Sequence, residues 1–399
     1  MRNRTITTVG VLLTAGALTL SACSSSKNKD KGSGLGGGNG ATKTYKIGFI
    51  GALSGPNAQL GINERQGAQL AVDQYNAKSD AKFKIQLVTS DSEGDPKKAP
   101  TAATTLASDP TIVGIIGPAF SGESLAVVGD KFCGASPPIP TITASASNAT
   151  LENQGWKCWH RVMPNDNVEG AQGADWLART GAKKVYVIDD LSAYGKGVAN
   201  TVRQELHTKG VAVISKGVDG TTTTNYGPIA QAVVGSGADA LFYGGYDAQS
   251  ALLAKALVAA GFKGRTVTGN GGKSSVFTKN AGSAGNGWYF TCGCQDATIA
   301  PAAKDFAAAY KAKWGEDPST YSPEAYDVAN LFIDAISKIS GTVDRTSLLT
   351  AVNQEDYKGI TAQISFEANG ENKATNLIVN LFRQEGGVIK GLGDINTQN

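Results

Sequence analysis

One serine of this chain lies where a small anion could be bound. Residues 112–116 form an uninterrupted apolar run, which is typical of a parallel strand covered on both faces. The run ends at Gly117, and Ser121 follows at the position expected for a helix N-cap. A hydroxyl group beside free backbone N–H groups, at the carboxyl end of a buried strand, can bind a carboxylate. The alternative is an ordinary turn whose hydroxyl caps its own helix.

The sequence lacks the patterns expected of an enzyme. No Gly-x-Gly-x-x-Gly motif or phosphate loop follows a predicted strand, and no Gly-x-Ser-x-Gly motif occurs. The two histidines, His160 and His207, are not placed as catalytic bases and give little support for a metal site. The net charge is +3, without a dense basic run after the first residues, which argues against a nucleic-acid partner. We therefore expect a small-molecule binder that needs no cofactor or metal.

The N-terminus predicts export and lipidation. Arg2 and Arg4 precede an apolar stretch that is too short to span a bilayer stably. That stretch ends in Leu-Ser-Ala-Cys, which resembles a bacterial lipobox with Cys23 as the lipidated residue. The alternative is a plain secretory signal with an incidental cysteine. We predict a signal peptide over 1–22, a flexible tether over 23–43, and an anchor on the outer face of the cell membrane.

Four further cysteines suggest disulfide bonds, because an exported protein enters an oxidising environment. Cys133 and Cys158 are predicted to pair and to close one strand–loop excursion. Cys292 and Cys294 are separated by a single glycine. They form either a tight local disulfide or two thiols.

The elements that must position Ser121 form two similar runs. Predicted strands and helices alternate over residues 45–143 and again over 168–268, which favours two α/β lobes with parallel sheets. Beyond the second run, this regular alternation of strands and helices ends. Helices are expected over 301–314 and 322–339, and strand-like segments near the C-terminus. We expect these late elements to return to the first lobe and to finish on the second.

Four motifs, in order along the chain, resemble those of one protein family. They are Gly-Ala-Leu-Ser-Gly-Pro at 51–56, the corner at 117–121, Tyr-Gly at 194–195 and Tyr-Gly-Gly-Tyr at 243–246. Together they are similar to the substrate-binding protein of branched-chain amino acid ABC transporters, and the resemblance covers the whole predicted mature chain.

The resemblance implies a type I periplasmic-binding-protein fold, with two doubly wound lobes joined by a three-crossover hinge. Lobe 1 would comprise 44–162 plus 293–365, and lobe 2 would comprise 163–292 plus 366–399. Such proteins close on a small ligand between the lobes and deliver it to the membrane subunits of an ABC permease, and we expect a monomer. A ligand-sensing surface protein without a permease is the alternative.

The resemblance also implies a binding site. Ser121 would hold the carboxylate of the ligand, and Tyr194 and Tyr246 would close the cleft from lobe 2, although both tyrosines could equally be interlobe packing. The other implied ligand-contacting residues are Ser145, Ala146 and Ser147 on the next loop, Leu60 over the ligand side chain, and Tyr326 in the side-chain pocket. The loop serines could also be plain turn residues.

One position departs from the family. Members that bind α-amino acids place a carboxylate where this chain has Gly271, and a buried ammonium without a partner costs several kcal/mol. Asp247 is the best substitute, although it could also serve as a helix N-cap, and Asp296 is a weaker one. The ligand is therefore either an amino acid paired with another acid, or an amide, a short carboxylate or an aromatic acid.

Overall fold

The computed structural model describes residues 42–373, 375 and 377–399. The predicted signal peptide, the lipidation site Cys23 and nearly all of the predicted tether lie outside these residues. None of the described helices is long and apolar enough to cross a membrane.

The first sheet consists of five parallel strands in the order β2-β1-β3-β4-β5. Its strands are β1 (Thr44–Gly51), β2 (Lys84–Asp91), β3 (Ile112–Ile116), β4 (Thr141–Thr143) and β5 (Trp159–Arg161). The helices that follow the first three strands are α1 (Ala58–Asn76), α2 (Ala99–Ala107) and α3 (Ser121–Val127). Every residue of β3 is buried, as its uninterrupted apolar run predicts.

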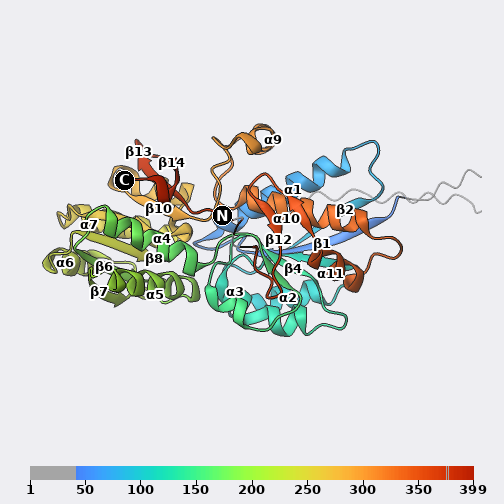
Figure 1. Ribbon diagram of the computed structural model, residues 1–399, viewed down its shortest axis with the longest axis horizontal. Helices are drawn as coiled ribbons and strands as arrows, with labels where there is room; N and C mark the ends of the chain where they lie inside the picture. Colours follow the sequence, from blue (N-terminus) through green and yellow to red (C-terminus); the bar gives the residue numbers. More distant parts are fainter. Residues whose placement is uncertain (1–41, 374, 376) are drawn as a thin grey trace, which may run out of the picture. The chain divides into compact units, whose positions relative to one another are not determined.

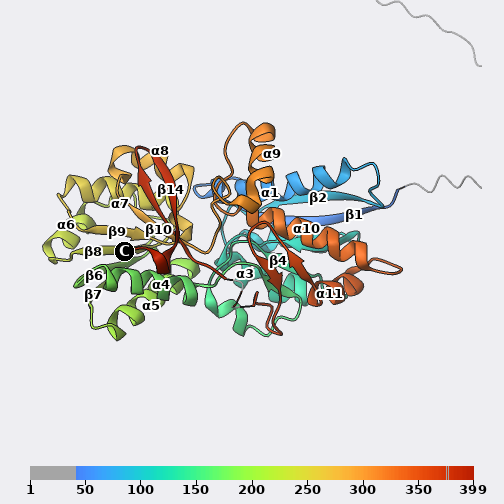
Figure 2. The ribbon, with the colours of Figure 1, turned by 45° about the horizontal axis from the view of Figure 1, so that its top comes forward.

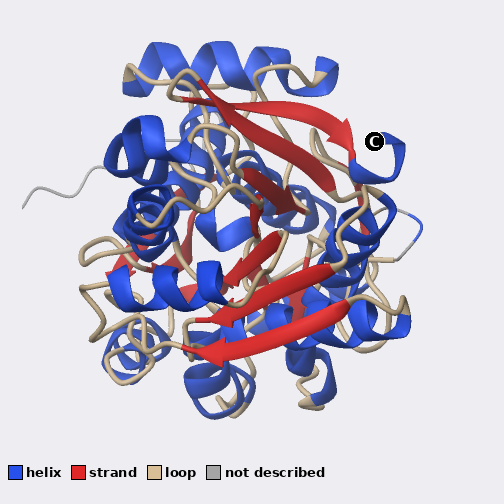
Figure 3. Ribbon diagram, turned by 90° about the vertical axis from the view of Figure 1, so that its left-hand side faces the viewer, coloured by secondary structure: helices blue, strands red, loops and turns tan. Residues whose placement is uncertain are grey.

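The second sheet has seven strands in the order β14-β13-β10-β9-β8-β6-β7. Its strands are β6 (Lys184–Asp189), β7 (Ala212–Gly217), β8 (Ala240–Gly244), β9 (Arg265–Thr268), β10 (Tyr289–Cys292), β13 (Asn380–Glu385) and β14 (Val388–Asp394). Its helices are α4 (Asp166–Arg179), α5 (Ala193–Thr208), α6 (Gly227–Gly235), α7 (Asp247–Ala259) and α8 (Ser275–Ala281). Helices cover both faces of these strands (Figure 3). The order of β6 to β10 repeats the winding of the first sheet, and only β13 and β14 are antiparallel additions.

The late elements return to the first sheet before they finish on the second. Those that return are α9 (Lys304–Trp314), α10 (Ser322–Lys338), α11 (Arg345–Asn353) and the small β11 (Asp356–Lys358) and β12 (Gln363–Ser365) pair. Helix α10 packs along α1 (Figure 1), and α11 contacts β3. Strand β13 then runs beside β10, and β14 pairs with β13 at the edge of the sheet (Figure 2). This confirms the predicted fold of two doubly wound lobes.

The chain leaves the first sheet for the last time later than the predicted boundary at 365. The backbone N–H of Arg161 in β5 donates to the carbonyl of Gly370 at 2.9 Å, and the N–H of Asn372 donates to the carbonyl of Arg161 at 3.0 Å. Residues 370–372 therefore still lie along β5. The sequence pattern does not indicate this contact, because Arg161 and Glu371 form an isolated bridge and not a full strand.

Short helical turns complete the structure. They are the π-helical η1 (Val128–Cys133) and the 3₁₀ turns η2 (Ala149–Asn153), η3 (Asn270–Gly272), η4 (Gly282–Gly285), η5 (Pro301–Ala303) and η7 (Ile395–Thr397). The η1 turn ends at Cys133, whose disulfide with Cys158 confirms the predicted pair, with the two Cα atoms 5.3 Å apart.

Two glycines bring helix α1 close to its neighbours. A Cβ atom at Gly67 would lie 1.9 Å from the carbonyl oxygen of Ser322, and one at Gly61 would lie 2.1 Å from the carbonyl oxygen of Ala52. Only glycine allows both approaches. Through these two close approaches, the face of α1 that carries Leu60 and Glu64 packs against the end of β1 and the start of α10.

Candidate ligand-binding site

A narrow pocket of about 10 Å³ lies between the loops that follow the strands of the two sheets, and we refer to it as the cavity. It is lined by Ala119, Phe120, Ser121 and Ser145 from the first lobe, Tyr194, Tyr246 and Asn270 from the second, and Tyr321 before α10. In each sheet the lining loops follow the strands where the winding order reverses, β3 in the first and β6 and β8 in the second. Ligands of doubly wound sheets bind at this position.

Ser121 is buried in this cavity, but it does not cap α3. The N-cap residue is Phe120, whose backbone N–H donates to the carboxylate of Glu123 at 3.0 Å. The predicted N-cap role of Ser121 is therefore wrong, because the acid three residues later satisfies the helix start. The Ser121 hydroxyl instead accepts a hydrogen bond from the backbone N–H of Asn148 at 3.1 Å. Its own proton has no acceptor among the described residues and is available to a ligand.

The loop after β4 is held by buried hydrogen bonds. The Ser145 hydroxyl lines the cavity and donates to the carbonyl of Ala119 at 2.5 Å. The carbonyl groups of Ala146 and Asn148 both accept from one guanidinium nitrogen of Arg161, at 2.9 Å each. The Ser147 hydroxyl is buried, and it has no hydrogen-bond partner in the described part of the chain. Ser145 thus lines the cavity, whereas Ala146 and Ser147 are not among its lining residues.

Three aromatic rings form the opposite wall and cross between the lobes. The ring of Phe120 lies 4.9 Å from that of Tyr246, which in turn lies 5.3 Å from that of Tyr194. The Tyr194 hydroxyl accepts a hydrogen bond from the backbone N–H of Gly271 at 3.0 Å. The structure therefore brings Ser121, Tyr194 and Tyr246 together, as the sequence predicts.

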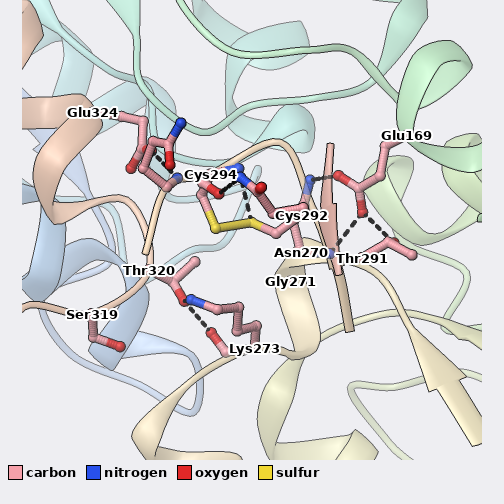
Figure 4. The surroundings of a disulfide bond; sticks show 12 residues. Glu169, Asn270, Gly271, Lys273, Thr291, Cys292, Cys294, Ser319, Thr320 and Glu324 are labelled. Carbon is pink, nitrogen blue, oxygen red and sulfur yellow. Dashed lines mark hydrogen bonds between the residues drawn. A yellow bond between two sulfur atoms is a disulfide. The ribbon is translucent and has the colours of Figure 1, made fainter. Parts of the chain in front are cut away.

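The loop at Gly271 leaves no room for the carboxylate that the family pattern would place there. A Cβ atom at Gly271 would lie 2.6 Å from the ring of Tyr194. The preceding residue, Asn270, lines the cavity and was not anticipated. Its backbone and side-chain N–H groups donate to the carboxylate of Glu169, at 2.9 and 2.6 Å, and Figure 4 shows this carboxylate also bonded to Thr291. The only sequence signal for Asn270 is its position next to Gly271.

Tyr326 lies outside the cavity. Its hydroxyl donates to the side chain of Gln74 at 2.7 Å, and its ring packs on Phe306 at 4.8 Å. Tyr321 lines the cavity in its place. Tyr321 has a positive φ of 70° directly before α10, which is a sparsely populated conformation for a bulky residue. The structure thus places Tyr321 at the cavity and the predicted Tyr326 outside it.

Three other predicted site residues, Leu60, Asp247 and Asp296, do not line the cavity. Leu60 is fully buried in the apolar cluster that also contains Phe120 and Tyr321. Asp247 accepts from the Ser274 hydroxyl at 2.5 Å and is the first residue of α7, whose N-cap is Tyr246, so its predicted N-cap role is wrong. Asp296 accepts from the backbone of Thr298 and Gly391.

Buried carboxyl groups surround the site. Burial raises the pKa of Glu123, Glu169 and Glu324 to about 7 and that of Asp166 to about 8. The pKa of Glu64, in α1, also lies well above its usual value, chiefly because of burial. Among the described residues no group of three or more His, Cys, Asp and Glu side chains could hold a metal ion.

A lysine and a disulfide lie behind Asn270, at the connection between the lobes. The ammonium of Lys273 donates to the Thr320 hydroxyl at 3.1 Å (Figure 4), and burial lowers its pKa to about 8. Cys292 and Cys294 form a disulfide at the end of β10. The sequence alone allowed either this disulfide or two thiols. None of these three residues lines the cavity.

Comparison with known proteins places the chain among binding proteins. Residues 44–384 match the model of a family described as periplasmic binding protein. The Leu/Ile/Val-binding protein homolog 3 of Brucella melitensis is 26% identical over 87% of this chain and 93% of its own length. The crystal structure of the branched-chain amino acid transporter substrate-binding protein LivJ of Streptococcus pneumoniae, in complex with isoleucine, has a TM-score of 0.78 and 26% identity over 88% of this chain and 100% of that one.

A more distant fold neighbour holds a different kind of ligand. The solute-binding protein of an ABC transporter of R. palustris, solved in complex with benzoate, has a TM-score of 0.78 at 19% identity, over 88% of this chain and 96% of that one. At this identity the likeness extends to the fold alone.

Proposed function

Because this chain belongs to the periplasmic binding protein family, we propose that it is the extracytoplasmic receptor of an ABC importer. It captures a small amino acid of the branched-chain type between its lobes. The observation that carries this proposal is the cavity whose wall combines the Ser121 hydroxyl of one lobe with Tyr194, Tyr246 and Asn270 of the other. A ligand that contacts both lobes favours the closed arrangement, and no chemical step is needed.

Membrane attachment and delivery complete the proposal. The lipobox-like segment ending in Cys23 would anchor the receptor by its acyl chains, and the tether before residue 44 would let it reach the permease. We propose that it acts as a monomer. Radiolabelled palmitate should be incorporated into the wild-type protein in a bacterial host and not into Cys23→Ala.

A receptor for a ligand without an ammonium group is the second candidate. It is favoured by Gly271, because the family's ammonium-pairing carboxylate is absent there and Tyr194 occupies the space. A thermal-shift screen of amino acids, amides, short carboxylic acids and aromatic acids separates the candidates, since a bound ligand raises the melting temperature. Stabilisation by leucine, isoleucine or valine supports the amino acid receptor, and stabilisation by none of these classes would refute the transport function.

Ser121→Ala should weaken binding of any ligand that carries a carboxylate. The substitution removes a buried hydroxyl donor to an anion, and a hydrogen bond to a charged group contributes about 1.5–3 kcal/mol. We therefore expect the dissociation constant to rise roughly tenfold to a hundredfold in isothermal titration calorimetry. Thr342→Ala, at an exposed loop far along the chain, is the control. Unchanged affinity in Ser121→Ala would remove Ser121 from the site.

A further inference from the structure

We propose that Glu64 binds the ammonium group of the ligand, in place of the missing carboxylate at position 271. This inference rests on the proposed receptor function and narrows the ligand to a class, small amino acids with a free α-ammonium. It assigns the ammonium to the first lobe, on helix α1, so both charged ends of the ligand would be bound by the same lobe.

Glu64 is buried and lacks a hydrogen-bond partner. Its side chain is 0% exposed, and neither carboxylate oxygen makes a hydrogen bond in the described part of the chain. Buried polar atoms are nearly always paired, and an orphaned buried carboxyl needs an explanation. A ligand cation supplies one, because it would pair with the carboxylate and offset the cost of its burial.

Glu64 is not itself a lining residue, but its neighbours place its carboxyl group next to the cavity. The Ser145 hydroxyl is close enough to oppose part of the rise in the pKa of Glu64, but it donates its proton to the carbonyl of Ala119. The charge of Glu64 also contributes to the raised pKa of Tyr321. Ser145 and Tyr321 both line the cavity, so the unpaired oxygens lie beside the space for the ligand.

Helix α1 holds Glu64 in this position. One residue before it, the side chain of Asn63 donates to the backbone carbonyl of Thr320 at 3.2 Å, next to Tyr321. Three residues after it, Gly67 touches the backbone of Ser322. The Glu64 side chain is therefore fixed between the start of α10 and the loop that carries Ser145. Ser145 and Ser121 line the same cavity, so an α-amino acid on the Ser121 hydroxyl would direct its ammonium towards Glu64.

The other buried acids are less suited to this role. Glu169 already accepts from Asn270 and Thr291, and Asp247 accepts from Ser274. Asp166 is also without a hydrogen-bond partner among the described residues. It lies beside Ser147, behind the cavity wall. The charge of Asp166 also acts on Tyr194 and Tyr246 of the lining, so Asp166 is the competing acid and not a control.

Glu64→Gln tests the inference, with L-leucine and 4-methylpentanoate, its analogue without the ammonium, as probes in calorimetry. We expect leucine affinity to fall at least tenfold in Glu64→Gln and to stay within about twofold in Asp130→Asn, the control at an exposed aspartate. The affinity for 4-methylpentanoate should not fall in Glu64→Gln. The substitution removes no hydrogen bond, so the variant should fold, and circular dichroism checks this.

A second measurement needs only the wild-type protein. Burial, followed by the charges of Glu123 and Glu324, raises the pKa of Glu64 well above its usual value, so an ammonium that binds beside it should lower that pKa and displace a proton. Calorimetry in two buffers of different ionisation enthalpy should show proton release upon leucine binding at pH 7, and none in Glu64→Gln.

The outcomes separate this inference from the receptor function. Equal leucine affinity in wild type and Glu64→Gln, or leucine binding by the wild type without proton release, overturns the role of Glu64 and leaves the receptor function intact. Binding of 4-methylpentanoate but not of leucine by the wild type overturns the ligand class as well. If no small molecule binds, the receptor function fails and the inference fails with it.

Discussion

Arg161→Met is expected to lower the free energy of unfolding by ~3–5 kcal/mol and to abolish ligand binding. Arg161 is fully buried, and two of its guanidinium nitrogens bond the two carboxylate oxygens of Glu371, at 3.1 and 2.5 Å. Removal of the cation leaves the Glu371 carboxylate, whose side chain is only 10% exposed, without its counter-charge. Such an uncompensated buried charge is among the most costly single defects.

The same substitution releases the loop that carries the serines. The third guanidinium nitrogen of Arg161 binds the carbonyl groups of Ala146 and Asn148, and the N–H of Asn148 in turn donates to the Ser121 hydroxyl. Arg161 therefore joins β5, the returning segment at Glu371 and the wall of the cavity. We expect binding to be lost even at temperatures at which the variant is still folded.

Chemical denaturation and calorimetry together measure both effects, and two variants serve as controls. Arg161→Met/Glu371→Leu removes both charges and should recover most of the stability, but not the binding, because the loop carbonyls stay unsatisfied. Lys311→Met, which removes an exposed lysine paired with Asp317, should cost less than about 1 kcal/mol. An unfolding midpoint of Arg161→Met equal to that of the wild type would contradict the prediction.

The two lobes and the main part of the site could be predicted because they depend on local patterns. Apolar runs such as that of β3 indicate buried parallel strands, and the side chains just after them must lie at one edge of the sheet. Ser121, Tyr194 and Tyr246 all follow strands in this way, and the structure brings them to one cavity. The apolar run and its end were sufficient for Ser121, whereas Tyr194 and Tyr246 were predicted from the family resemblance.

The rest of the site depends on contacts between distant segments. Tyr321 and Tyr326 lie on the same short stretch, and only the backbone turn before α10 decides which ring faces the cavity. Glu64 lies in a helix with a mixed pattern, and its burial follows from the close approach of Gly67 to Ser322. Strand β14 and the pairing of residues 370–372 with β5 were missed, because glycine and charged residues break the alternation typical of strands.

The unliganded protein is expected to gain ~3 kcal/mol of stability when the pH falls from 8 to 6.5. Burial raises the pKa of Asp166 to about 8 and that of Glu123, Glu169 and Glu324 to about 7, whereas the same groups titrate near pH 4 in the unfolded chain. Between these pH values the folded state binds more protons than the unfolded state. The stability from these groups is fully present below pH 4 and is lost as the pH rises through 7 and 8.

Two groups act in the opposite direction. Burial lowers the pKa of Lys273 to about 8, so its contribution is lost as the pH falls through 8, and the remaining effect in this interval is smaller than that of the four acids. The pKa of His160 is lowered to about 4, and its contribution is lost only below pH 6.5. The interval from 8 to 6.5 therefore isolates the buried acids.

Urea denaturation at the two pH values measures the difference, and Asp166→Asn identifies its largest single source. The Asp166 carboxyl makes no hydrogen bond among the described residues, so the variant should be more stable than wild type at pH 8 and less dependent on pH. Asp130→Asn, at an exposed aspartate, should leave the pH dependence unchanged. Wild-type protein that is more stable at pH 8 than at pH 6.5 would refute the prediction.

The same acids should make the effect of a ligand on stability depend on its charge. An ammonium in the cavity lowers the pKa of the carboxyl beside it, so leucine should raise the melting temperature more at pH 8 than at pH 6.5. An anion without an ammonium raises those pKa values, and 4-methylpentanoate or benzoate should stabilise more at pH 6.5. A melting-temperature gain that is larger at pH 6.5 for leucine as well would mean that no acidic side chain of this site meets the ligand's ammonium.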